Sequence, residues 1–295
     1  MSPNPEMTML PKVSCVMTTF RRKTCVERSV MMWLKQDYAG PLELIILNTD
    51  EEFPIVIEDR AYLDQFSNRN ICIVNNNIDQ ETRQPYTNVG SIRRDAMLLA
   101  TGEYYICWDD DDVFLQWCVR QCVDGVLRHP QADGWKPRYS LFEITNNPNG
   151  IVQAQNTLEA SIIVRLATLR EIGFNLENGT EHLKWYTTLS HGGRIIEDAY
   201  SIPGYSYRWN DPTVAGHKQS GNMGDPNNFE NHKRASQDRF NGPLTLTSDS
   251  TILLPYMDYF RRYTGPKKET VPQDLLYPPN FSQELIDRYV AQYLA

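Results

Sequence analysis

Four consecutive aspartates, Asp109 to Asp112, are the residues of this sequence whose chemistry is easiest to interpret. They directly follow an apolar segment, 104–108, whose residue types predict a buried strand. Adjacent carboxylates repel one another, so such a cluster is typical of a site that binds a divalent cation. The spacing excludes an EF-hand, because Phe114 stands where that loop needs glycine and Arg120 where it needs glutamate. A solvated acidic turn is the alternative interpretation.

The segments around the aspartates alternate short apolar runs with helical patterns, which is typical of a parallel sheet covered by helices. Strands are expected at 12–18, 42–47, 71–74 and 104–108, and helices at 24–34, 88–99 and 115–126. The pair Thr24 and Glu27 has the spacing of a capping box at the start of the first helix. Ligands of such sheets bind beyond the carboxyl ends of the strands, so the aspartates are expected to lie in the binding crevice.

After residue 134 the pattern changes, and we expect the parallel order to end. Strands are expected at 135–145, 158–164, 194–197 and 205–209, and short helices at 165–172 and 182–189. The segment 211–241 is rich in Gly, Asn and Asp and is too long for an ordinary connection, which favours a lid over a bound ligand. A Pro-rich linker and an amphipathic terminal helix from Ser282 form an expected C-terminal extension, 242–295, behind a main domain of 1–241.

Composition narrows the class of protein. The formal net charge is -8, which argues against a broad basic face for polyanions. No apolar run approaches the roughly 20 residues that span a bilayer, and the first twelve residues do not have the pattern of a secretory signal, so we expect a cytoplasmic protein without a transmembrane segment. The six cysteines lack metal-ligand spacing and are expected to be core thiols.

Three motifs follow one another in an informative order. The strand at 13–18 continues into Thr19-Phe20-Arg21-Arg22, the later helix begins with Asn88-x-Gly90-x-x-Arg93-Arg94-Asp95, and Gly102-Glu103-Tyr104 leads to the aspartates. Over about 12–217, this order resembles the family 2 glycosyltransferases with the GT-A fold. The resemblance implies an α/β, Rossmann-like mixed sheet flanked by helices, with a donor half at about 12–130 and an acceptor half at about 131–241. It also implies transfer of a sugar from a nucleotide diphosphate, most often UDP, to an acceptor hydroxyl, with inversion and with Mn²⁺ or Mg²⁺.

The resemblance also implies roles for individual residues, position by position. The metal would be held by Asp109, Asp111 and, on the expected lid, His217. The loop after the first strand would hold the nucleoside, Arg94 would lie near the diphosphate or the base, and Asp109 would meet the ribose or the metal. The implied donor-binding set is Thr18, Thr19, Phe20, Arg21, Arg94, Asp109 and Asp110.

The sequence departs from the family pattern at two places. The family usually has an aspartate after the second strand to bind uracil, whereas this chain has Asn48 and, slightly later, Asp50, which leaves the nucleobase open. An acidic pair usually ends in the catalytic base, whereas this chain has Glu181 and His182. Either residue could take the proton of the acceptor hydroxyl, because an imidazole also suits general-base catalysis near neutral pH. A structural histidine at a helix start is the alternative for His182.

The sequence leaves two alternatives to glycosyl transfer. A nucleotidyltransferase is disfavoured, because the segment from Thr18 to Arg22 contains no glycine for a phosphate loop. A non-catalytic module that binds a nucleotide-sugar or a glycan is the principal alternative, since the usual acidic pair is altered. The acceptor stays open among a glycan, a lipid-linked glycan, a protein and, as for some phage enzymes, a hydroxylated DNA base.

Overall fold

The computed structural model describes residues 9–56, 64, 66–144, 151–155, 159–198, 204–209 and 245–246. The expected lid at 211–241, the Pro-rich linker and the terminal helix therefore lie outside the described residues. Within the described part of the chain, no helix is both long enough and apolar enough to cross a membrane.

The centre of the molecule is a sheet of seven strands in the order β10-β6-β9-β4-β1-β2-β3. Four of them are mutually parallel and follow the expected apolar runs: β1 (Val13–Thr19), β2 (Leu42–Asn48), β3 (Arg69–Asn75) and β4 (Tyr104–Cys107). Every residue of β2 and β4 is buried, which explains why β4 is apolar throughout and β2 is apolar except at Glu43 and Asn48, without the alternation of a half-exposed strand.

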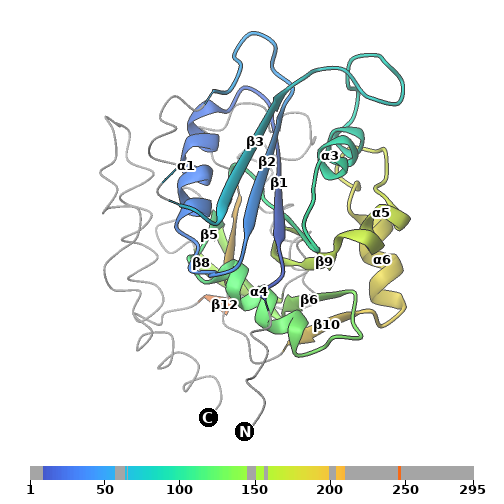
Figure 1. Cartoon of the computed structure of the whole chain (residues 1–295). Coiled ribbons are helices and arrows are strands. Elements are labelled where there is room, and N and C mark those ends of the chain that lie inside the picture. Colours follow the sequence, from blue (N-terminus) through green and yellow to red (C-terminus); the bar gives the residue numbers. More distant parts are fainter. Residues whose placement is uncertain are drawn as a thin grey trace, which may run out of the picture.

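Helices cover both faces of the parallel strands. Figure 1 shows α1 (Lys23–Leu34) on one side of β1, β2 and β3 and α3 (Val89–Leu98) on the other. The next helix, α4 (Cys118–Leu127), packs against β6 and β9. The core between these layers contains four fully buried tryptophans: Trp33, Trp108, Trp135 and Trp185. All six cysteines are free thiols, and five of them are buried, as the sequence predicted.

The parallel order ends after α4, as expected. Strand β9 (Ile163–Arg165) runs antiparallel to both β4 and β6 (Gly134–Pro137), and β10 (Ile195–Asp198) adds parallel to β6 at the edge. The helices α5 (Leu166–Ile172) and α6 (Leu183–His191) pack against each other beside this part of the sheet. The strand expected at 158–164 is wrong in its first half. Glu159–Ser161 forms a 3₁₀ turn, closed by a hydrogen bond from Ile162 N to Glu159 O, and pairing with β4 begins only after it.

A second sheet has the order β12-β8-β7-β11-β5. Its strands are β5 (Val113–Phe114), β7 (Tyr139–Ile144), β8 (Ile151–Gln155), β11 (Tyr205–Trp209) and β12 (Thr245–Leu246). The single strand expected at 135–145 is therefore two strands, β6 and β7, which pair in different sheets. Because β5 directly follows the aspartates and pairs with β11, this sheet fixes the far end of the acidic segment.

The N-terminal ends of α3 and α1 show how local sequence signals compete with tertiary contacts. Asn88 caps α3 by accepting a hydrogen bond of 2.8 Å from Ser91 N, as its residue type predicts. The capping box at Thr24 and Glu27 is wrong, because α1 begins at Lys23 and its N-cap, Arg22, makes no side-chain cap. The guanidinium of Arg22 contacts the aspartates instead, so a contact across the sheet determines where this helix begins.

Candidate functional site

The strand order of the large sheet reverses between β1 and β4. From β1 the chain adds β2 and β3 on one side, then crosses back to place β4 on the other side of β1. A crevice opens beyond the carboxyl ends of two strands at such a point, and it is the usual ligand site of open α/β sheets. The hydroxyl of Thr19, the last residue of β1, donates a hydrogen bond of 2.5 Å to Asp110 Oδ2, which joins the two strand ends.

The aspartates are compensated in part by the chain's own cations. Arg22 Nη1 lies 2.9 Å from a carboxylate oxygen of Asp110 and 2.9 Å from one of Asp111. Asp112 accepts a hydrogen bond from the hydroxyl of Tyr205 on β11. Burial raises the pKa of Asp110 to about 6, although the positive charge of Arg22 opposes this shift. The repulsion that suggested a bound metal is therefore relieved partly by an arginine that also begins α1.

Two of the four aspartates have partly exposed side chains. The side chains of Asp109 and Asp111 are 20% and 10% exposed, whereas Asp110 is 1% exposed. Hard carboxylate oxygens are the ligands that Mn²⁺ and Mg²⁺ prefer, so the donor set at these two residues fits a divalent cation. An arginine contacts each of them, so a bound cation would share these carboxylates with Arg22 and Arg93.

Arg93 connects the aspartates to the other half of the site. Its Nη2 donates a hydrogen bond of 2.9 Å to Asp109 Oδ1, and its Nε lies 3.5 Å from Glu181 Oε1. The side chain is nine-tenths buried and also contacts the thiol of Cys107. Burial acts to lower the pKa of Arg93, but Asp109, Cys107 and Glu181 together raise it well above its usual value, so the guanidinium stays charged. One arginine thus contacts a residue expected to bind the donor and a residue expected to act as base.

Close packing of α3 holds Glu181 in place. A Cβ atom on Gly90 would lie 1.8 Å from the backbone oxygen of Asn175, so only glycine lets this loop approach the helix. Asn178 Oδ1 accepts a hydrogen bond of 2.9 Å from Val89 N, and Asn175 N donates to the backbone oxygen of Glu181. The glycine in the motif after Asn88 is therefore needed for packing in this fold.

A cluster of three titratable side chains forms the acceptor-side wall. Glu159, Glu181 and His182 are largely buried, and each places one potential ligand atom within 4.8 Å of the other two. His182 Nδ1 lies 3.2 Å from Glu159 Oε1. Among the described residues, Glu181 Oε2 has no hydrogen-bond partner although it is buried. A group of this kind can exchange a proton or hold a cation.

A cavity of about 610 Å³ lies beyond the carboxyl ends of β1, β2 and β3. Phe20 and Arg21 form one wall, and Arg21 lies over the ring of Phe20 with its Cζ 5.0 Å from the ring centre. The backbone of Arg21 has a φ of 57°, a left-handed turn that non-glycine residues seldom adopt. Asp50 lines the cavity, is buried, and has an Oδ2 atom with no hydrogen-bond partner among the described residues. This carboxylate can accept an N–H from a nucleobase.

The structure places the other predicted donor residues less directly. Thr18 pairs with Leu47 inside the sheet, one residue before the strand end. Asn48 is buried, donates to Asn75 Oδ1 at 2.9 Å and to the backbone oxygen of Phe53 at 3.1 Å, and does not line the cavity that contains Asp50. It shapes the turn that presents Asp50, and it lines a smaller space of about 260 Å³.

Arg94 points away from the aspartates. It pairs with Asp79 and Asp95 at 2.8 Å each, and it also contacts Glu81. Burial by itself would raise the pKa of Asp79, but backbone N–H groups and Arg94 lower it to about 2. Successive residues of a helix point about 100° apart, so only one of the two adjacent arginines can face β4. His217 lies outside the described residues.

Three residues of the site were missed by sequence reasoning. Arg22 and Arg93 each stand beside an arginine that was chosen, and the signal for Arg93 was its spacing of three residues from both Gly90 and Ala96 on the buried face of α3. No motif or spacing singled out Glu159, which lies in the segment 158–164 whose residue types predict a strand.

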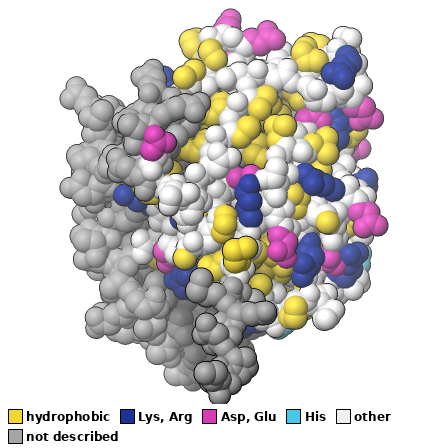
Figure 2. Space-filling model, in the orientation of Figure 1, with side chains coloured by type: hydrophobic (Ala, Val, Ile, Leu, Met, Phe, Trp, Pro, Cys, Tyr) yellow, Lys and Arg dark blue, Asp and Glu magenta, His cyan; other side chains and the backbone are white. Residues whose placement is uncertain are grey.

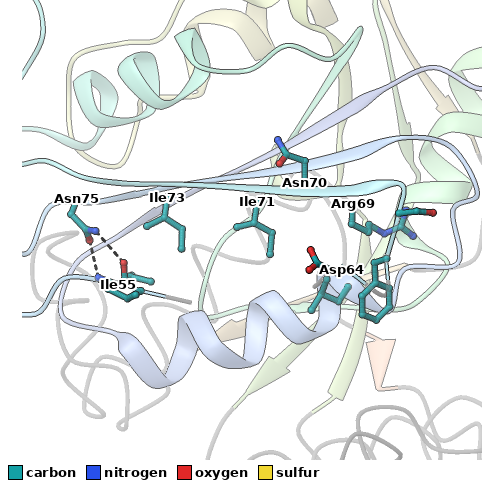
Figure 3. Close-up of a pocket in the computed structure, with 11 residues that line it drawn as sticks. Ile55, Asp64, Arg69, Asn70, Ile71, Ile73 and Asn75 are labelled. Atoms are coloured by element: carbon teal, nitrogen blue, oxygen red, sulfur yellow. Dashed lines mark hydrogen bonds between the residues drawn. The ribbon is translucent and has the colours of Figure 1, made fainter. Parts of the chain in front are cut away.

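A further cavity, of about 510 Å³, lies at the outer edge of the sheet between α1 and β3. Figure 3 shows Ile71 and Ile73 pointing from β3 toward α1, and Asn75 hydrogen-bonded to the backbone of Ile55. Figure 2 shows hydrophobic side chains gathered over the middle of the face where Figure 1 places β3. None of the predicted site residues lines this cavity.

Solved structures provide the comparison with known proteins. No protein-family model and no curated protein matches the chain. The structure is similar to TarS 1-349 of S. aureus in complex with UDP-GlcNAc, with a TM-score of 0.50 and 15% identity over 96% of this chain and 88% of that one. It also matches a mannosyltransferase from Pyrobaculum calidifontis in complex with GDP-Man and Mn²⁺, with a TM-score of 0.46 and 13% identity over 97% and 87% of the two chains.

A third match is the glucosyl-3-phosphoglycerate synthase of Mycobacterium tuberculosis in complex with Mn²⁺, UDP-glucose and phosphoglyceric acid. Its TM-score is 0.47, with 13% identity over 79% of this chain and 81% of that one. At these identities the likeness concerns the fold. Taken with the sheet order and the reversal between β1 and β4, the TarS match shows that this chain has the GT-A fold that its sequence predicted.

Proposed function

We propose that the protein is a metal-dependent glycosyltransferase that moves a sugar from a nucleotide diphosphate to an acceptor hydroxyl with inversion. The observation that supports this most directly is the bridge from Asp109 through Arg93 to Glu181. Direct displacement needs the diphosphate site and the base on opposite sides of one sugar ring. A single guanidinium spans the residues expected on the two sides, so both are within the reach of one bound sugar.

The donor binds across the carboxyl ends of β1, β2 and β4 in this proposal. The nucleoside occupies the cavity lined by Phe20, Arg21 and Asp50, where the aromatic ring can stack and the carboxylate can accept an N–H. Asp109 and Asp111 would hold Mn²⁺ or Mg²⁺, which supplies positive charge to the diphosphate when bound.

The arginines complement the diphosphate as well. Arg22 lies beside two of the aspartates and is only partly buried, and Arg93 keeps its charge at the junction of the two halves. Fixed positive charges in a partly buried crevice stabilise the charge that develops on a leaving diphosphate. Glu181 or His182 takes the proton of the acceptor hydroxyl. The donor half then corresponds to about 12–130, the acceptor half to 131–241 and an extension to 242–295.

Calorimetry with UDP-glucose, UDP-GlcNAc and GDP-mannose, with and without Mn²⁺, tests donor binding. We expect at least one donor to bind more tightly with Mn²⁺. Incubation of that donor with glycan, lipid-linked glycan, protein and hydroxymethylated DNA, followed by mass spectrometry, then identifies the acceptor by the added mass of the sugar residue that the donor carries. Binding without transfer or hydrolysis would favour a non-catalytic module, and no binding of any nucleotide-sugar would overturn the proposal.

A further inference from the structure

We infer that Arg94 is a positioning residue for donor binding, because it fixes the hairpin 77–86 that forms one wall of the nucleoside cavity. The inference rests on the proposed function and adds to it the segment between β3 and α3. Arg94 does not touch the donor in this proposal. It acts through Asp79 on the hairpin and through Asp95, its neighbour on α3.

The chain between β3 and α3 folds back on itself as a short hairpin. An antiparallel bridge joins Ile78 to Pro85, and the backbone N–H of Tyr86 donates to the backbone oxygen of Asn77 at 3.0 Å. Figure 1 shows this segment as the teal loop that projects between β3 and α3. A hairpin of two strands is only marginally stable by itself in water, so this one depends on contacts with the rest of the protein.

Asp79 closes the turn of the hairpin. Its Oδ1 atom accepts hydrogen bonds of 2.8 Å from Glu81 N and 3.0 Å from Thr82 N, and its side chain is only 7% exposed. A buried carboxylate is costly unless a cation accompanies it, and Arg94 Nη2 lies 2.8 Å from the same oxygen. The charge that organises the turn is thereby fixed to α3.

Asp95 makes the second connection from α3 to the hairpin. Its Oδ1 atom lies 2.8 Å from Arg94 Nε, and its Oδ2 atom accepts hydrogen bonds of 2.8 Å from Gln80 N and from the hydroxyl of Tyr86. Among the described residues, no cation other than Arg94 pairs with Asp79 or Asp95. Without this guanidinium, two buried negative charges would lie close together uncompensated, and the hairpin would separate from α3.

The hairpin contributes Asn77, Pro85 and Tyr86 to the lining of the cavity that contains Asp50. An aromatic ring offers a stacking surface to a base, and an amide offers both a donor and an acceptor. Because the hydroxyl of Tyr86 bonds to Asp95, the position of its ring depends on the same contacts that hold the hairpin. A hairpin detached from α3 would leave the cavity without this wall.

Loss of the anchor should weaken donor binding without slowing the chemical step. If only about a tenth of the free protein has the hairpin in place, the apparent Kd rises about 10-fold, because the donor must then select that fraction. Once the donor is bound the hairpin is in place, so kcat at saturating donor is unchanged. A raised KM with an unchanged kcat is therefore the kinetic signature of this role.

Calorimetry with UDP and GDP, each with Mn²⁺, tests the role of Arg94, and pyrophosphate with Mn²⁺ is a probe that lacks the nucleoside. The variants are Arg94→Gln and Asp79→Asn, of which the second removes a charge but keeps an oxygen for the turn. We expect the Kd of the nucleotide that the wild type binds to rise about 10-fold in both. The Kd of pyrophosphate, and kcat at saturating donor, should stay within about twofold of wild type.

Arg120→Gln is the matched control. Arg120 forms a two-bond pair with Asp37, and neither residue lines the cavity, so this variant should bind nucleotide as the wild type does. A pyrophosphate Kd that rises in parallel with the nucleotide Kd in Arg94→Gln would mean that Arg94 contacts the diphosphate itself. That result would overturn the inference, as would a wild-type nucleotide Kd in both variants.

Hydrogen exchange of the free, full-length protein gives a readout that is independent of any donor. The amides of Gln80, Glu81, Thr82 and Tyr86 should exchange faster in both variants, while those of β1 and β2 exchange as in the wild type, which excludes a loss of folding. Unchanged exchange of the hairpin amides would show that Arg94 does not hold it. Failure of the proposed function is a different result, namely that the wild type itself binds no nucleotide.

Discussion

The hydroxyl of Thr19 donates a hydrogen bond of 2.5 Å to Asp110 across the junction of β1 and β4. Asp110 is 1% exposed, and with Arg22 also on its carboxylate it links two strand ends and the start of α1. Asp110 thus has a structural role, and Asp109 and Asp111 on either side of it are more exposed.

Replacing Thr19 by valine tests this link. Thr19→Val keeps the shape of the side chain but removes a donor to a buried carboxylate, so the free energy of unfolding should fall by about 1–3 kcal/mol. Urea denaturation measures the change. Thr187→Val, at an exposed position of α6, is the control and should stay within about 0.5 kcal/mol of wild type. Equal losses in the two variants would contradict a special role for Thr19.

Asp50, rather than Asn48, should recognise the nucleobase. Removing its charge in Asp50→Asn weakens a charge-assisted hydrogen bond of the kind worth about 1.5–3 kcal/mol, so nucleotide Kd should rise about 10–100-fold. Asn48→Ala should instead destabilise the fold, because it leaves buried partners in the turn unsatisfied. Calorimetry and denaturation of both variants separate the two effects, and the reverse pattern would assign recognition to Asn48.

Divalent-cation binding should depend on Asp111. In Asp111→Asn the affinity for Mn²⁺ in the presence of the nucleotide should fall at least about 10-fold, since a charged oxygen ligand is lost. Asp37→Asn is a matched control, because that carboxylate pairs with Arg120 at the surface, 3.0 Å away. Electron paramagnetic resonance counts free Mn²⁺ directly. Unchanged affinity in Asp111→Asn, or full transfer activity in excess EDTA, would refute this site.

The adjacent arginines should differ in their effects. Arg93→Lys replaces a planar group that contacts both Asp109 and Glu181 with a point charge, so kcat should fall at least about 10-fold. Arg94→Lys should change kcat less, because its partners lie in the segment around Asp79 and Glu81. Initial rates at saturating donor compare the two variants. A larger loss in Arg94→Lys would return the donor-binding role to Arg94.

Stability should decrease in acid partly through Glu43. Burial alone would raise the pKa of Glu43, but hydrogen bonds from Lys12, Ser14 and Thr101 lower it from 4.5 to about 2. Because the folded pKa is the lower one, the unfolded chain takes up the proton first. The stabilisation is complete above pH 4.5 and is lost as the pH falls toward 2. As the pH falls from 4.5 to 2, the urea midpoint of Glu43→Gln should therefore fall less steeply than that of the wild type. Asp79 also loses its stabilising effect in acid, but it does so in both proteins. Parallel midpoint curves would contradict the assignment.

The sequence alone determined the parallel strands and the place of the aspartates. Parallel strands that are buried on both faces are rich in apolar residues without alternation. Strand β4 is such a run, and β2 is one apart from Glu43 and Asn48, so the positions of both strands can be predicted without tertiary information. The aspartates follow β4 directly, and strand ends of this kind form the ligand crevice whatever the details of packing. The change of pattern after residue 134 likewise predicted the end of parallel order.

Only the tertiary structure decided which side chains meet. The rotation of α3 about its axis turns Arg93 toward Asp109 and Arg94 toward Asp79. The turn after β2, in which Asp50 N donates to Asn48 Oδ1, gives Asp50 and Asn48 different surroundings. Glu159 and His182 are 23 residues apart on a 3₁₀ turn and a helix start, and their contact depends on how α6 packs beside β9. Composition and periodicity describe one segment at a time. A contact between segments is set by sheet order and helix rotation, which residue spacing within a segment does not encode.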